Sequence, residues 1–203
     1  MFPEVENLNT KELTIQRLLD GFLVIVDNNR NTFVPKEVYQ EKNKAKYLDF
    51  LGLNNEDSVV LADFIELADM YNVYSVSKND YETVGKSSKN LKFQHASSVL
   101  LTSLIKENLE RTDDTRVYLN IKDQCFEMMV LKGANLLFDN NFRFKTKEDF
   151  LYFLLFSIEQ LHLDAGSVPV YFLGMIEEKS KIVEMTSRYV RDIRFKKLTP
   201  CEL

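Results

Sequence analysis

The chain has 203 residues, 45% of them hydrophobic and 28% charged, which is enough to bury a core as one large domain or two small ones. Its formal net charge of −5 disfavours nucleic acid as a partner, because phosphate binding draws on clustered Lys and Arg. No signal peptide, membrane span or lipidation motif is recognisable, and Cys125 and Cys201 are too few for a disulfide framework, so we expect a cytoplasmic protein without membrane insertion.

The first 51 residues predict two helices on either side of a strand. A cap at Asn9 begins the first helix, which ends at Gly21. The fully apolar run from Phe22 to Val26 is typical of a short strand. Pro35 is well placed as the first residue of a second helix, because its missing N–H is not needed there, and this helix is predicted to run to about Leu51.

The next segment gives mixed signals, because its apolar residues fit both a helix and strands. We predict two short strands between Ser58 and Ser77, with a turn near Asp69. The polar segment from Glu110 to Thr115 is the most linker-like part of the chain, and it predicts a boundary between domains at 1–110 and 111–203. The elements expected between these two segments are a helix at Asn79–Lys86, a strand at Leu91–Gln94 and a helix at Ala96–Leu109.

A clear strand pattern opens the second half of the chain. Val117, Leu119 and Ile121 alternate with Tyr118 and Asn120, which is the period of a strand with two different faces. Two further antiparallel strands, connected by short turns, are predicted at Cys125–Leu131 and Asn135–Phe144.

A very apolar helix is predicted next. Thr146 stands at its N-cap with Asp149 three residues on, an acidic variant of the capping box. The run from Phe150 to Ile158 is apolar on nearly all sides and too short to span a bilayer, so it is predicted to be a core helix. The remaining elements are a buried, parallel strand at Val168–Leu173, a helix at Glu177–Val190 and a short strand at Ile193–Phe195. The predicted order in this half is therefore β-β-β-α-β-α-β.

The order of elements repeats within the chain. Helix, buried strand, polar turn and helix are predicted at Asn9–Leu51 and again at Thr146–Val190, although the residues themselves do not repeat. This repetition predicts a duplicated α/β unit.

Three other features are interpreted as structural. His95 and His162 lie far apart without Cys or acidic residues at ligand spacing, so no metal site is predicted, and His95 is expected to cap a helix or to lie in the core. The Gly85-Lys86-Ser87 triplet lacks the preceding glycine of a phosphate loop, so it is not interpreted as a phosphate site. A basic cluster near the end is interpreted as a solvated helix end and tail in preference to an anion site; its members are Arg188, Arg191, Arg194, Lys196 and Lys197.

Short motifs spread over nearly the whole chain resemble those of a family of uncharacterised bacterial proteins, a domain of unknown function. That family's fold is similar to the actin-like ATPase, duplicated ribonuclease H-like architecture. The motifs are Asn31-Thr32-Phe33-Val34-Pro35, His95, Asn140-Asn141-Phe142-Arg143-Phe144, Glu148-Asp149-Phe150-Leu151-Tyr152, Gln160-Leu161, and Leu173-Gly174-Met175-Ile176 with Ser180 and Tyr189. The resemblance implies an α/β fold with two βαβ-type halves and mixed sheets.

Members of that family open with strands upstream of the point where this chain begins. The resemblance therefore implies that the first half lacks its opening strands. We expect either a natively short protein or a preceding segment of roughly 50 residues, the size of a strand meander with its connections.

The resemblance also locates a candidate nucleotide cleft. Working actin-like enzymes carry Asp-x-Gly with a nearby Ser or Thr in two hairpins, because glycine allows backbone amides to approach phosphates. Here the second-half hairpin, Asn120 to Cys125, has neither a glycine nor a hydroxyl, and one glycine of an expected pair remains at Gly174. The candidate residues of this degenerate cleft are Asn120, Asp123 and Gly174. No cofactor is expected, and ATP with Mg²⁺ is the alternative ligand that such a cleft could take. No catalytic residue is predicted.

A ribonuclease H-type nuclease is excluded by residue type. Its divalent metals would need carboxylates from the first and fourth strands of the half, where this chain has Asn120 and the acid-free run Val170 to Leu173.

Two functions follow from the resemblance. The first is a noncatalytic, degenerate actin-like module that acts as a scaffold for an unidentified protein partner, like the actin-like component of pilus assembly. The alternative is a nucleotide-binding ATPase or kinase-like enzyme with atypical phosphate loops.

Overall fold

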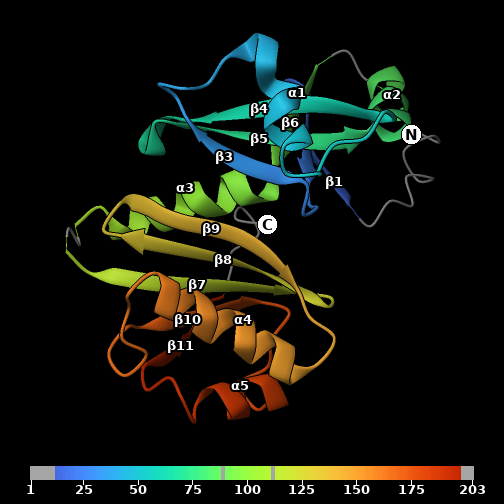
Figure 1. Cartoon of the computed structure of the whole chain (residues 1–203). Helices are drawn as coiled ribbons and strands as arrows, with labels where there is room; N and C mark the ends of the chain where they lie inside the picture. Colours follow the sequence, from blue (N-terminus) through green and yellow to red (C-terminus); the bar gives the residue numbers. More distant parts are fainter. Residues whose placement is uncertain (1–11, 88–89, 111–112, 198–203) are drawn as a thin grey trace. The chain divides into compact units, whose positions relative to one another are not determined.

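The computed structural model describes residues 12–87, 90–110 and 113–197 (Figure 1). The chain divides into two compact units between Leu104 and Ile105. This point lies inside helix α3 (Ala96–Asn108), six residues before the expected boundary after residue 110, because the helix continues from one unit into the next. Each unit is described by itself below.

The first sheet of unit 1 has the order β1-β2-β6. Its strands are β1 (Leu13–Arg17), β2 (Phe22–Val26) and β6 (Leu91–His95); β1 pairs antiparallel with β2, and β2 pairs parallel with β6. Strands at the positions of β2 and β6 were predicted, but the prediction of a first helix is wrong over β1. Gly21 lies in a hairpin turn, where Leu18 N donates to Gly21 O at 2.9 Å, and the expected cap at Asn9 lies outside the described residues.

The second sheet of unit 1 is antiparallel, with the order β3-β5-β4. Its strands are β3 (Asn31–Pro35), β4 (Ser58–Ile65) and β5 (Met70–Ser77), so the two strands predicted between Ser58 and Ser77 are confirmed. Their connection is the 3-10 turn η3 (Glu66–Ala68) followed by Asp69, whose φ of 50° is left-handed.

Pro35 ends a strand and does not begin a helix, so that prediction is wrong. It is the last residue of the edge strand β3, where a missing N–H also costs little. The helical part of the following segment is confined to η2 (Glu41–Asn43) and α1 (Lys44–Asp49). The expected repeat of the helix-strand-turn-helix order therefore fails in its first copy.

Helix α2 (Lys78–Ser87) follows directly after β5. A buried polar network joins the start of α3 to the second sheet of unit 1. The Asp63 carboxylate accepts hydrogen bonds from Tyr74 Oη (3.0 Å), His95 N (2.7 Å) and Ser98 Oγ (2.6 Å). His95 Nδ1 accepts from the backbone N–H of Ser97 at 3.1 Å, and the side chain is fully buried. The capping and core role expected for His95 is confirmed, and the network fixes the start of α3.

Unit 2 is built on a five-stranded mixed sheet with the order β11-β10-β7-β8-β9. Its strands are β7 (Thr115–Lys122), β8 (Cys125–Lys132), β9 (Asn135–Arg143), β10 (Val170–Gly174) and β11 (Ile193–Phe195). The first three form an antiparallel meander, and β10 pairs parallel with both β7 and β11. The predicted order of elements and the parallel placement of the buried strand are confirmed.

Helices α4 (Lys147–Gln160) and α5 (Lys181–Thr186) cover one face of this sheet (Figure 1). The capping box of α4 is present, since Thr146 Oγ1 accepts from Asp149 N at 3.1 Å and Asp149 Oδ2 accepts from Thr146 N at 3.0 Å. Phe150 is fully buried and packs against Phe126, Phe144 and Phe172, which confirms the core helix. Helix α5 is shorter than predicted, because Ser180 caps it and the residues before Ser180 form a loop.

Side chains alternate between the two faces of the sheet. Val117, Leu119 and Ile121 belong to the core under α4 and α5, whereas Tyr118 and Asn120 point to the other face. This alternation decides which residues near the carboxyl end of β7 can share a site.

Candidate functional site

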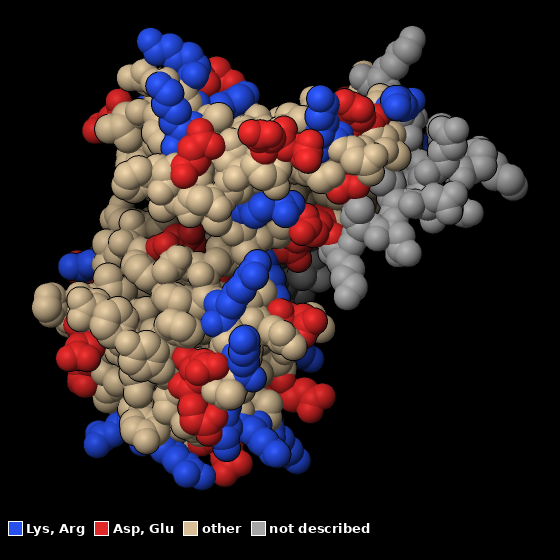
Figure 2. All heavy atoms as spheres, turned by 45° about the vertical axis from the view of Figure 1, so that its right-hand side comes forward, with Lys and Arg blue, Asp and Glu red and all other residues tan. Residues whose placement is uncertain are grey.

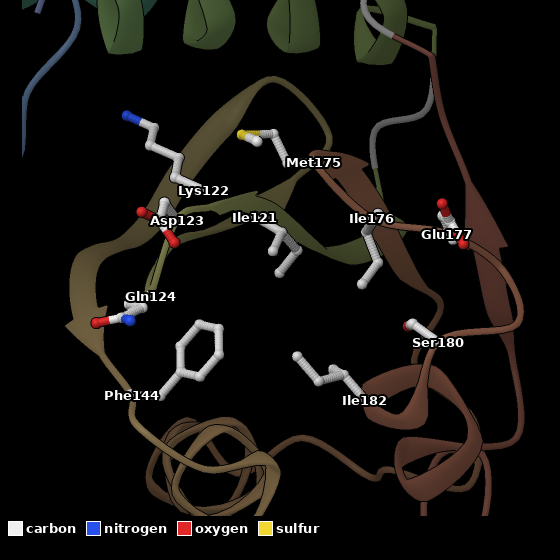
Figure 3. Close-up of a pocket in the computed structure, with 10 residues that line it drawn as sticks. All are labelled: Ile121, Lys122, Asp123, Gln124, Phe144, Met175, Ile176, Glu177, Ser180 and Ile182. Carbon is white, nitrogen blue, oxygen red and sulfur yellow. The ribbon is translucent and has the colours of Figure 1, made fainter. Parts of the chain in front are cut away.

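A pocket of about 390 Å³ opens in unit 2 at the carboxyl ends of β7 and β10 (Figure 3). Its walls are the β7–β8 turn, the residue after β9, the loop after β10 and the start of α5. The carboxyl ends of parallel strands are where open α/β sheets bind ligands, and the volume is within the range of small-molecule sites. The apolar lining residues are Ile121, Phe144, Met175, Ile176 and Ile182, and the polar ones are Lys122, Asp123, Gln124, Glu177 and Ser180.

The interior of the pocket is apolar. Figure 3 shows Ile121, Phe144, Ile176 and Ile182 directed toward its centre, whereas Lys122 is directed away from it. One Lys and two carboxylates stand at the rim, so the formal charge of the lining is −1. This lining suits an apolar group of a ligand better than a polyphosphate.

The β7–β8 turn consists of Asp123 and Gln124 alone. Gln124 has a φ of 54°, a left-handed conformation that a two-residue hairpin normally gives to Gly or Asn. Its carbonyl accepts the Phe144 N–H at 3.0 Å, which joins the turn to the end of β9. Asp123 is exposed at the tip of the turn, so its carboxylate is accessible at the mouth of the pocket.

Gly174 is required by the close approach of β10 to β7. Its φ is 77°, and a Cβ built on it would lie 2.3 Å from the Ile121 carbonyl oxygen and 2.6 Å from Asn120 Oδ1. The next N–H, from Met175, donates to the same Ile121 oxygen at 2.8 Å. The glycine therefore serves strand packing, and the amide that follows it is already bonded within the protein.

The three residues predicted for a nucleotide cleft lie at the same end of the sheet, but they do not face one space. Asp123 lines the pocket, and Gly174 borders it beside Met175. Asn120 lies on the opposite face from Ile121, where its Nδ2 donates to Glu127 Oε2 at 3.4 Å. The alternation of faces along β7 is the reason for this separation.

Sequence reasoning missed the apolar side of the pocket. Phe144 was predicted to end a strand and Ile182 to lie within the helix at Glu177–Val190, and neither position suggests a site. Ser180 was part of the family motif, and its Oγ accepts from Val183 N at 3.4 Å as the cap of α5. Only their place in the folded chain brings these residues together.

The described residues offer little for catalysis. Within 12–87, 90–110 and 113–197, no group of three or more His, Cys, Asp or Glu side chains could hold a metal ion. Neither of the two histidines is among the described lining residues of the pocket, so no histidine base stands beside the Ser180 hydroxyl there.

The basic cluster near the end of the described chain is largely ion-paired. Arg188 pairs with Glu184 at 3.1 Å, Arg194 pairs with Asp192 at 2.7 Å, and Lys196 pairs with Glu107. On the face shown in Figure 2, Lys and Arg side chains lie among Asp and Glu side chains. These pairs favour the interpretation of the cluster as a solvated surface.

Residues 2–193 match the family described as "Protein of unknown function (DUF3822)". The chain belongs to the DUF3822 family. A Bacteroides thetaiotaomicron protein with an actin-like ATPase fold and unknown function is similar in structure, with a TM-score of 0.80 and 15% identity over 86% of this chain and 67% of that one. The PilM–PilN type IV pilus biogenesis complex contains a second similar structure, with a TM-score of 0.58 and 12% identity over 86% of this chain and 69% of that one.

These likenesses, together with the five-stranded sheet of unit 2, show that the DUF3822 chain has the actin-like ATPase fold. The predicted resemblance to an uncharacterised family of this fold and the predicted fold class are confirmed. Comparison with curated proteins finds no match. Among the described residues, no helix is both long and apolar enough to cross a membrane.

Proposed function

We propose that this DUF3822 chain is a noncatalytic protein-interaction module, in which the pocket beside the β7–β8 turn receives an apolar side chain of a partner protein. The observation that carries the proposal lies directly after β10. Gly174 packs on Ile121 there, and the Met175 N–H donates to the Ile121 carbonyl, so this amide is not available to a ligand. A phosphate site needs such amides to point at the ligand.

The lining of the pocket supports the same proposal. Four of its side chains direct apolar groups to the centre, and the rim carries both Asp123 and Glu177, whose negative charges oppose a phosphate. Protein interfaces concentrate their binding energy in a few apolar or aromatic anchors that fill pockets of this kind. The PilM–PilN complex adds a precedent, because a protein of this fold is found there with a partner protein.

The test is a pull-down from an extract of the source cells with two matched variants. Met175 lines the pocket and is 76% exposed, and Leu137 on β9 is 52% exposed and outside the pocket lining, so Met175→Glu and Leu137→Glu place the same charge on comparable surfaces. We expect a stoichiometric partner with the wild type and with Leu137→Glu, and at least a tenfold loss with Met175→Glu. Recovery of the same partner in equal amount by Met175→Glu would refute the pocket as the docking site.

A second candidate function is a nucleotide-binding ATPase or kinase-like enzyme. The observation that favours it is the position of the pocket at the carboxyl ends of β7 and β10, with a volume that can hold a planar ring. A thermal shift with Mg-ATP separates the two candidates. Clear stabilisation of the wild type that is lost in Asp123→Ala would support the enzyme. Gly174→Val is unsuitable for this test, because its side chain would collide with Ile121.

The composition of the chain is ordinary for a cytoplasmic protein, and we propose that the module works there. Fractionation of source cells, with the protein detected by antibody, checks the compartment. Recovery in the membrane fraction after a high-salt wash would contradict it.

A further inference from the structure

Polar side chains form a row across the face of the unit 2 sheet that is turned away from α4 and α5. The strand register places Asn120 of β7 opposite Glu127 of β8, and Glu127 opposite Asn141 of β9. Asp139 lies two residues before Asn141 on the same strand, so it shares this face and is a diagonal neighbour of Glu127. Four side chains that carry oxygen acceptors therefore lie on three adjacent strands.

The two carboxylates of this group are short of hydrogen-bond donors. Glu127 is 1% exposed; Asn120 Nδ2 donates to its Oε2 at 3.4 Å, but no donor among the described residues reaches its Oε1. Asp139 Oδ1 is also out of contact with solvent, and no donor in the described part of the chain reaches it. Burial raises the pKa of the Asp139 carboxyl well above its usual range, and the charge of Glu127 raises it further, against the opposing charge of Lys122.

A buried carboxylate beside a half-buried one, each with an oxygen that lacks a donor, is costly unless something positive joins them. The effective penalty for burying an ionised group is several kcal/mol, and leaving its oxygens unpaired adds to that cost. A proton or a cation can remove the cost. A proton held between two carboxylates needs no further oxygen, whereas a hard divalent cation takes six or more oxygen ligands from carboxylates, amides and water. The side chain of Asn141, opposite Glu127 on β9, offers an amide oxygen for the second requirement, whereas Asn120 turns its Nδ2 toward Glu127.

We propose that Glu127 and Asp139, with the amide oxygen of Asn141 beside them, bind one hard divalent cation such as Mg²⁺, Ca²⁺ or Mn²⁺. Carboxylate and amide oxygens are the ligands that these ions prefer over softer metals. The site lies on the opposite face of the sheet from the pocket and does not depend on the function proposed for it. It includes only two carboxylates, so amide and water oxygens complete the coordination.

Titration of the full chain with Mn²⁺, followed by electron paramagnetic resonance, tests the proposal. We expect the wild type to bind one Mn²⁺ per chain and excess Mg²⁺ or Ca²⁺ to displace it. Glu127→Gln and Asp139→Asn keep the side-chain shape and remove one charge each, and each should weaken Mn²⁺ binding at least tenfold. Glu184→Gln, a change to an exposed carboxylate on α5, should bind as the wild type does.

The same variants separate loss of the ion from loss of the fold. Because Glu127→Gln and Asp139→Asn relieve repulsion between like charges, we expect both to unfold in EDTA at the same temperature as the wild type or higher. Absence of Mn²⁺ binding by the wild type at millimolar concentration would overturn the proposal. Equal Mn²⁺ binding by the wild type and by both variants would also overturn it. A wild type that binds no Mn²⁺ but gains stability as the pH falls toward 5 would instead point to a shared proton.

Discussion

Replacing Gly174 by alanine tests whether this glycine is held by strand packing. The substitution adds one methyl group at a residue whose φ is 77°. The new Cβ would lie 2.3 Å from the Ile121 carbonyl oxygen, and that oxygen also accepts the Met175 N–H at 2.8 Å. Because the nearest atom belongs to the backbone of β7, it cannot move aside as the end of a flexible side chain could.

Three effects set the size of the loss. A non-glycine residue in a left-handed conformation costs about 1–2 kcal/mol. Forcing an extra methyl group into a packed site costs about 1–3 kcal/mol more. Separating β10 from β7 to make room would weaken the Met175 hydrogen bond, worth about 1 kcal/mol. We expect the free energy of unfolding of unit 2 to fall by about 2–6 kcal/mol, a large share of the ~5–15 kcal/mol typical of a domain.

Urea unfolding followed by circular dichroism, with hydrogen exchange of peptides from β7 and β10, measures this loss. Gly52 and Gly85 provide matched controls, because no heavy atom lies within 4 Å of a Cβ built on either. Gly52 has a φ of 66°, so Gly52→Ala should show the conformational cost alone, about 1–2 kcal/mol. Gly85 lies in α2, and Gly85→Ala should stabilise its helix by roughly 0.5–1 kcal/mol.

The comparison between the two left-handed glycines decides the question. If Gly174→Ala costs no more than Gly52→Ala, the close approach to Ile121 contributes nothing and the reasoning is refuted. Gly174 would then be available for a role in ligand binding.

Three further predictions concern the cores and the caps. Phe150→Ala should destabilise unit 2 by about 3–5 kcal/mol, measured by urea unfolding, because it empties a fully buried site; a loss below 1 kcal/mol would contradict the packing described for α4. Thr146→Ala should cost about 1 kcal/mol by removing the N-cap of α4, and faster hydrogen exchange confined to the first turn of α4 would locate the effect. Burial raises the pKa of Asp63, so the folded chain binds this proton more tightly than the unfolded chain does. The stabilisation from Asp63 should therefore be present below its unfolded pKa of about 3.9 and be lost as the pH rises through the folded pKa; an unchanged pH dependence of unfolding in Asp63→Asn would refute this assignment.

The helices and strands of unit 2 were predictable because the apolar residues that each of them buries follow a regular pattern in the sequence. The alternation from Val117 to Ile121 reports one buried face of β7, and the cap at Thr146 marks the start of a helix whose apolar run packs into the core. In unit 1 the run from Leu13 to Leu19 has apolar spacings that fit a helix as well as a strand. Pairing of β1 with β2 made it a strand, and such pairing is not visible within a short window of sequence.

The candidate site was predictable in part. The alternation along β7 already places Asn120 and Ile121 on opposite faces, so the separation of Asn120 from the pocket follows from the sequence. The apolar walls do not follow from it. Phe144, Ile176 and Ile182 come from three segments that only the folded sheet and α5 bring to one place.

The left-handed conformation of Gln124 marks a position where one substitution could change the turn beside the pocket. Glycine would adopt the φ of 54° without the cost of about 1–2 kcal/mol that a larger residue carries. The turn has two residues, Asp123 and Gln124, and Lys122 pairs with Cys125 across it. The shape of this corner could therefore be changed by one substitution in the turn, and the strand pairing of the sheet would not have to be rebuilt.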